Sequence, residues 1–150
     1  MDIPDPQPGL VIRYAYLWRD EQQRGSDEGW KDRPCAIVLA VAKADGATRV
    51  VVAAITHTPP QAGTGAIAVP TLTAKRLGLD DVPQWIVSHE FNIFTWPGPD
   101  IRPAPGSNPP SIAYGQLPHG LTTQLINQAR EHVRQRTNIT VERDEPQQRR

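Results

Sequence analysis

The amino-acid sequence predicts that residues 1–150 form a single, mainly β domain: a small, partly open β-barrel with a C-terminal helix packed on it. Several short segments rich in β-branched residues are separated by hairpin and turn signals. One segment near the C-terminus has helical periodicity, and strands do not alternate with helices as they do in parallel folds. A chain of 150 residues is long enough to bury one core without a metal or a disulfide.

The strand predictions begin after an extended, proline-rich lead-in at residues 1–8. In the first strand segment, hydrophobic alternation puts Leu10, Ile12, Tyr14 and Tyr16 on one face. The predicted strand segments are, in chain order, 9–18, 35–42, 49–56, 66–70, 84–96 and 111–117. The segment 84–96 is long for a single strand, and the sequence pattern does not decide whether the strand bends.

Two of these segments, 35–42 and 49–56, are predicted to pair. Residues 35–42 are apolar on both faces, which is typical of a central strand. Asp45-Gly46 lies between the two segments and is a strong signal for a tight hairpin turn. The strands should therefore run antiparallel, with the start of the first and the end of the second together at the end of the hairpin opposite the turn.

The remaining segments are predicted as loops and helices. Residues 19–32 and the Pro/Gly-rich stretch 97–110 read as loops, and 71–79 suits one or two helical turns. The segment 120–136 predicts a C-terminal helix, and 142–150 a frayed tail. The apolar stripe of the predicted helix consists of Leu121, Leu125, Ala129 and Val133.

Composition excludes several classes of function. Basic and acidic residues number 16 each, so a nucleic-acid partner would have to be met by a local patch. Cys35 is the single cysteine and lies in an apolar strand, which favours a buried hydrophobe over a catalytic thiol. The four histidines lack metal-ligand spacing, so we expect no metal and no cofactor. With neither a signal-peptide pattern nor a membrane-spanning apolar run, a cytoplasmic location is expected.

The predicted hairpin brings Arg33 and Thr56 together. Pro34 fixes the backbone behind Arg33 at the start of one strand, and Thr56 ends the next. A guanidinium fork and a hydroxyl could together bind a phosphate and stabilise negative charge that develops on it. The alternative is a surface arginine paired to Asp32 or Glu28, beside a threonine chosen for its β-propensity. Spacing alone favours this alternative.

The ordered set of motifs resembles the MazF/PemK family of toxin endoribonucleases. It runs from Gly9-Leu10-Val11-Ile12 through Arg33-Pro34 and its apolar strand to a second strand that ends at Thr56, and then to Gly115-Gln116-Leu117 before the last helix. The resemblance implies an SH3-like barrel, a homodimer, a cognate antitoxin, and metal-independent cleavage of single-stranded RNA by attack of the 2′-hydroxyl, which DNA lacks.

The resemblance also implies roles for individual residues. The catalytic pair of the family carries over to Arg33 and Thr56, and an acidic residue five positions before that arginine carries over to Glu28. Candidate RNA contacts beside them are Lys31, His57 and Trp30, and Trp30 could instead cover the end of the barrel. An imidazole suits proton transfer near neutral pH, but His57 would face away from Thr56 unless the strand has already ended. Trp85 and Trp96 are expected in the core or at the dimer interface.

Two other functions remain open at this point. One is a topoisomerase poison on the same fold, similar to CcdB. The other is a binding module that keeps the barrel and has lost catalysis. The segment 88–103 favours the second, because it is aromatic and proline-rich where the family carries a basic segment.

Overall fold

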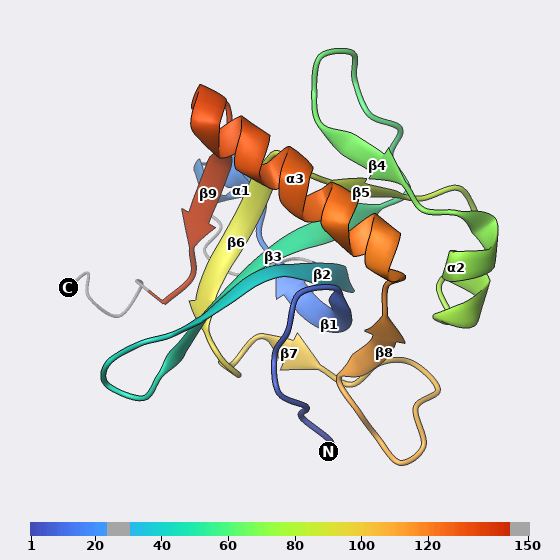
Figure 1. The fold of residues 1–150 in the computed structure, drawn as a ribbon. Helices are drawn as coiled ribbons and strands as arrows, with labels where there is room; N and C mark the ends of the chain where they lie inside the picture. Colours follow the sequence, from blue (N-terminus) through green and yellow to red (C-terminus); the bar gives the residue numbers. More distant parts are fainter. Residues whose placement is uncertain (24–30, 145–150) are drawn as a thin grey trace.

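The computed structural model describes residues 1–23 and 31–144, and it is mainly β with a helix near the C-terminus (Figure 1). Within these residues nine strands form one sheet, whose ladders are antiparallel except for the one formed by the last strand. The strands are β1 (Leu10–Tyr16), β2 (Lys31–Ala42), β3 (Thr48–Thr56), β4 (Ala66–Ala68), β5 (Trp85–Val87), β6 (Glu90–Thr95), β7 (Ile101–Arg102), β8 (Ala113–Gln116) and β9 (Ile139–Glu142). The helices are α1 (Arg19–Gln23), α2 (Thr71–Arg76) and α3 (His119–Gln135). Among the described residues, no helix is long and apolar enough to cross a membrane.

The predicted hairpin is confirmed. β2 pairs with β3 antiparallel, and the backbone N–H of Lys43 donates to the carbonyl of Ala47 at 2.7 Å across the turn. Gly46 has φ +89°, a left-handed conformation that glycine adopts without strain. β2 is also central, with β1 on its other edge. The C-terminal end of β2 is not buried on both faces, however, because Leu39 and Val41 are exposed.

The sheet is strongly curved because two of its strands each pair with two partners along one edge. β3 pairs with β6 through residues 49–52 and with β5 through Ile55 and Thr56. The predicted strand segment 84–96 is accordingly bent, and it divides into β5 and β6 at Ser88 and His89. β1 is shared in the same way between β8 and β7.

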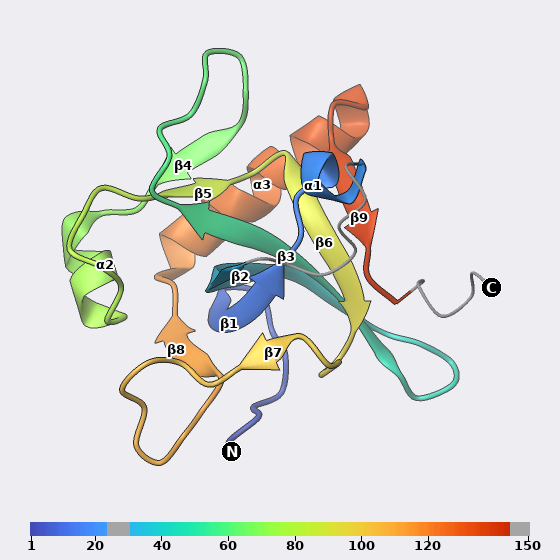
Figure 2. The ribbon, with the colours of Figure 1, turned by 180° about the vertical axis from the view of Figure 1, so that it is seen from behind.

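The core has two parts, one on each face of the sheet. Helix α3 crosses one face, in front of the sheet in Figure 1 and behind it in Figure 2, and its Leu121, Leu125 and Ala129 are buried there. Val133, predicted on the same stripe, is 55% exposed. The second core includes Leu10, Ile12, Tyr14 and Tyr16, so the predicted alternation of β1 is confirmed.

Side chains join β1 to β6, two strands between which the described residues form no backbone ladder. The carboxamide of Asn92, on β6, accepts a hydrogen bond from the N–H of Leu17 at 2.9 Å and donates one to its carbonyl at 2.8 Å. Arg143 donates to Asn92 Oδ1 and to the carbonyl of Ala15, and it pairs with Asp100 at 3.3 Å. We call these five residues, with Asn92 at their centre, the Asn92 clamp.

Three predicted loop or tail segments contain ordered structure. Helix α1 lies within the predicted loop 19–32, and the two-residue strand β7 lies within 97–110. The prediction of a frayed tail is wrong for residues 142–144. Glu142 ends β9, Arg143 is buried in the clamp, and Glu142 and Asp144 both pair with Arg49. Pairing of β9 with β6 orders this segment, and residues 145–150 lie outside the described residues.

The aromatic residues of the segment 84–96 pack mainly within the chain itself. Phe91 and Phe94 are 3% and 2% exposed, and Trp96 packs against the same cluster as Phe94. The homodimer implied by the family resemblance gains no support from Phe91 and Phe94, because both are buried within the chain. Dimerisation stays a prediction.

The clamp predicts a large loss of stability for Asn92→Ala. The substitution leaves the N–H and the carbonyl of Leu17 buried without partners, so the free energy of unfolding should fall by about 2–4 kcal/mol. Chemical denaturation measures this. The matched control is Asn127→Ala on the exposed side of α3, which should change the stability by less than about 0.5 kcal/mol. Equal effects of the two substitutions would contradict the role of the clamp.

Candidate functional site

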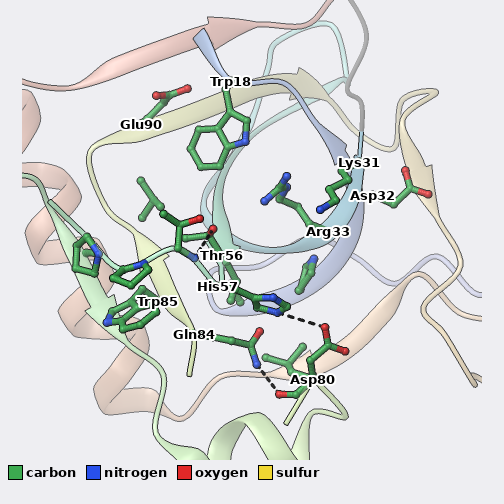
Figure 3. A pocket seen from close by; sticks show the side chains of 18 of the residues that line it. Trp18, Lys31, Asp32, Arg33, Thr56, His57, Asp80, Gln84, Trp85 and Glu90 are labelled. Atoms are coloured by element: carbon green, nitrogen blue, oxygen red, sulfur yellow. Dashed lines mark hydrogen bonds and ion pairs between the residues drawn. The ribbon is translucent and has the colours of Figure 1, made fainter. Parts of the chain in front are cut away.

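An open cavity of about 960 Å³ lies where the start of β2, the end of β3 and the segments around β1 and β5 meet. Four of the six residues singled out from the sequence line it: Arg33, Thr56, Lys31 and His57 (Figure 3). The other two, Glu28 and Trp30, lie outside the described residues. We call this cavity the groove.

The hairpin register explains why Arg33 and Thr56 meet. Cys35 lies opposite Ala54 in the β2–β3 ladder, and continuing that register by two residues puts Arg33 opposite Thr56. The register shifts by one residue between Ile37 and Leu39, so the turn at Asp45-Gly46 and this irregularity together determine which residues face each other here. This neighbourhood was predicted from the sequence and is confirmed.

The side chain of Arg33 is held by an aromatic ring. Its guanidinium carbon lies 5.4 Å from the ring centroid of Trp18, a cation–π distance. Within residues 1–23 and 31–144 no carboxylate forms an ion pair with Arg33, and its buried Nε has no hydrogen-bond partner. Asp32 pairs instead with Arg102 at 3.7 Å. The alternative pairing of Arg33 with Asp32 is therefore not formed, and pairing with Glu28 falls outside the described chain.

Thr56 and His57 both contribute to the groove because β3 ends at Thr56. The Thr56 hydroxyl oxygen accepts a hydrogen bond from the N–H of Thr58 at 3.1 Å, which leaves its own proton available for donation. Since His57 is past the end of the strand, the alternation of strand side chains does not turn it away. Its Nε2 lies 3.2 Å from Asp80 Oδ2, and both side chains are largely exposed.

Glu90 also lines the groove, and the sequence interpretation missed it. It is 8% exposed, and its Oε2 accepts a hydrogen bond from the N–H of Arg19 at 2.8 Å. Burial, which removes water from the carboxylate, raises the pKa of Glu90 above its ordinary value. A charged residue directly before the strand residues Phe91-Asn92-Ile93-Phe94 was the signal that could have revealed it.

The groove is not a positively charged surface. Its described lining carries five carboxylates, Asp20, Glu21, Asp32, Asp80 and Glu90, and three permanent cations, Arg13, Lys31 and Arg33. No group of three or more potential metal ligands occurs among the described residues. Cys35 is fully buried just behind Arg33, and burial raises the pKa of its thiol far above the ordinary value. Cys35 is therefore a buried side chain within the strand, as the sequence predicted.

The raised pKa of Glu90 predicts a pH-dependent effect of Glu90→Gln on stability. Folding favours the protonated form, so the wild-type chain loses stability as the pH rises through the range from the ordinary glutamate pKa to the raised one. The glutamine does not ionise, so its melting temperature relative to wild type should rise over this range. Thermal melts between about pH 3 and pH 8 measure the difference.

Glu131→Gln is the control with the opposite sign. A hydrogen bond from Arg134 lowers the pKa of the exposed Glu131, so the ionised form is favoured in the folded chain. Its melting temperature relative to wild type should fall slightly as the pH rises. A Glu90→Gln difference that stays constant with pH would contradict the raised pKa.

Comparison of this chain with protein-family models, with curated proteins and with solved structures yields no match, so the site is interpreted from its own geometry.

Proposed function

We propose that this chain is the toxin of a toxin–antitoxin pair, a metal-independent endoribonuclease that cleaves single-stranded RNA. The observation that carries the proposal is the state of Arg33. Its guanidinium faces an open groove beside Thr56, and a ring rather than a described carboxylate holds it. Such an arrangement leaves the planar fork free to bind a phosphate.

In the proposed reaction the 2′-hydroxyl of the RNA is the nucleophile. Its oxygen gives up its proton to a base in the groove and forms a bond to the adjacent phosphorus while the bond from phosphorus to the 5′-oxygen breaks, which leaves a 2′,3′-cyclic phosphate and a 5′-hydroxyl. The leaving oxygen takes a proton from water in the open groove. Arg33 donates to the non-bridging oxygens as their charge increases, and the Thr56 hydroxyl adds a further donor.

The other parts of the proposal come from the family resemblance. Lys31 and His57 line the groove and could contact the RNA backbone, and Glu28 and Trp30 keep their proposed roles from the sequence. The curvature of the sheet and the Asn92 clamp support a partly open SH3-like barrel. A second copy of the chain, a cognate antitoxin and a cytoplasmic location complete the proposal.

A catalytically inactive binding module is the second candidate, and the charge of the groove favours it. Five carboxylates against three permanent cations suit a basic protein segment better than a long RNA backbone. The same charge pattern is compatible with ribonuclease action on a short stretch of RNA centred on Arg33. None of the described features of this groove specifically favours a topoisomerase poison similar to CcdB.

Arg33→Ala should reduce RNA cleavage by ~10²–10³-fold, the effect of removing one donor to the transition state. Arg33→Lys should not restore activity, because the ammonium group keeps the charge and loses the planar fork. Single-turnover cleavage of single-stranded RNA in EDTA measures both variants, and the matching DNA should remain intact.

Thermal melting of the same variants separates chemistry from folding. Arg33 is half-buried at a strand entrance, so neither variant should unfold the domain. Should Arg33→Ala lose activity only in proportion to its unfolded fraction, Arg33 is a structural residue. Cleavage that requires an added divalent metal would contradict the metal-independent mechanism.

Trp18→Leu should weaken cleavage through Arg33. Loss of a cation–π contact of about 0.5–2 kcal/mol corresponds to a loss of roughly 2–30-fold in rate if the ring orients the guanidinium for the transition state. Trp96→Leu is the matched control, because Trp96 is similarly half-buried but packs near Phe94, and it does not line the groove. Equal losses of activity in both variants, matched by equal losses of stability, would leave Trp18 with a packing role alone.

A further inference from the structure

Burying the Glu90 carboxylate costs free energy, and the local contacts of this side chain do not explain why that cost is met. Within the described chain its hydrogen bond is the one from the N–H of Arg19, at the start of the five-residue helix α1. An uncharged glutamine carbonyl could accept the same hydrogen bond without the free-energy cost of desolvating a carboxylate. Capping α1 therefore does not explain why the side chain at this position is an acid.

Glu90 shares the groove with Arg33 and Thr56. In the view of Figure 3 the ring of Trp18 lies between Glu90 and Arg33, and Glu90 lines the same cavity. A second observation relates the two charges. The buried Tyr16 hydroxyl has its pKa raised by burial, raised further by Glu90 and lowered by Arg33, so this single group lies within electrostatic range of both.

Other charged groups around Glu90 act in both directions. Arg19 and His89, its neighbours in the fold, favour the carboxylate, whereas Asp20 on α1 and loss of water favour the acid. Desolvation is the largest of these effects, so the carboxyl titrates closer to neutral pH than an exposed glutamate does. A base of this kind retains more affinity for a proton at working pH than an ordinary carboxylate.

We propose that Glu90 is the general base of this groove, which accepts the proton of the attacking 2′-hydroxyl. This assignment rests on the proposed ribonuclease function and deepens it. The proton moves from the 2′-oxygen to a carboxylate oxygen of Glu90 as the 2′-oxygen bonds to phosphorus and the 5′-oxygen departs. Glu90 then returns the proton to water, and Arg33 and Thr56 keep their contacts with the phosphate.

The test is a pH–rate profile of single-turnover cleavage in EDTA, from about pH 4 to pH 9, for the wild type and Glu90→Gln. The glutamine retains an acceptor for the N–H of Arg19, and thermal melting verifies that the variant is folded. We expect a loss of about 10²-fold or more and disappearance of the acidic limb of the profile. Two controls accompany it: Glu131→Gln on the exposed side of α3, and His57→Gln in the groove, whose imidazole is the other candidate proton acceptor.

The outcomes separate the inference from the function on which it rests. If Arg33→Ala abolishes cleavage while Glu90→Gln keeps the wild-type rate and acidic limb, Glu90 is a structural cap and the assignment is wrong. Loss of the limb in His57→Gln together with its retention in Glu90→Gln would transfer the role to His57. A wild-type chain that cleaves no RNA at any pH overturns the proposed function and, with it, the role of Glu90.

Discussion

The Asn92 clamp is the constraint on which the groove depends, because a single buried carboxamide joins two strands that have no ladder between them. It binds both backbone groups of Leu17, as a neighbouring strand would. Trp18 follows Leu17, and the N–H of Arg19 bonds to Glu90, which lies two residues before Asn92 on the same face of β6. The clamp thereby fixes both the ring that holds Arg33 and the carboxylate across the groove.

Two arginines among the described residues lie over aromatic rings, and their partners distinguish their roles. Arg143 lies 5.5 Å from the ring centroid of Tyr14, and its side chain is 4% exposed and satisfied by Asp100, Asn92 and a backbone carbonyl. Arg33 has a similar ring contact but faces open space, without a described carboxylate. The ring stabilises the position of a cation in both cases. Only Arg33 retains donors that a ligand could use, so the count of polar partners separates a structural cation from a candidate functional one.

The sequence predicted those features that depend on local signals. Asp45-Gly46 predicted the hairpin, and the hairpin placed Arg33 and Thr56 at the same end, but the shift of register between Ile37 and Leu39 that sets them opposite each other was not predicted. Contacts between distant segments could not be predicted in this way. Glu90 faces the groove because Asn92 and Leu17 hold β6 against the end of β1, and strand β9 forms because β6 has a free edge to pair with. Residues 142–144 were interpreted as frayed because their polar sequence gives no sign of the buried partners that Arg143 finds.

The position of Arg143 in the chain also affects the order in which the fold can be completed. It donates a hydrogen bond to the carbonyl of Ala15, a residue 128 positions earlier. This contact of strand β1 therefore cannot form until nearly the whole described chain has been synthesised. Contacts of such long sequence separation form slowly, because much chain entropy is lost before they are made. During synthesis, the hairpin of β2 and β3 can assemble well before Arg143 emerges. A nascent chain therefore carries Arg33 opposite Thr56 before β1 is locked against β6, and its groove stays incomplete until the last strand is added.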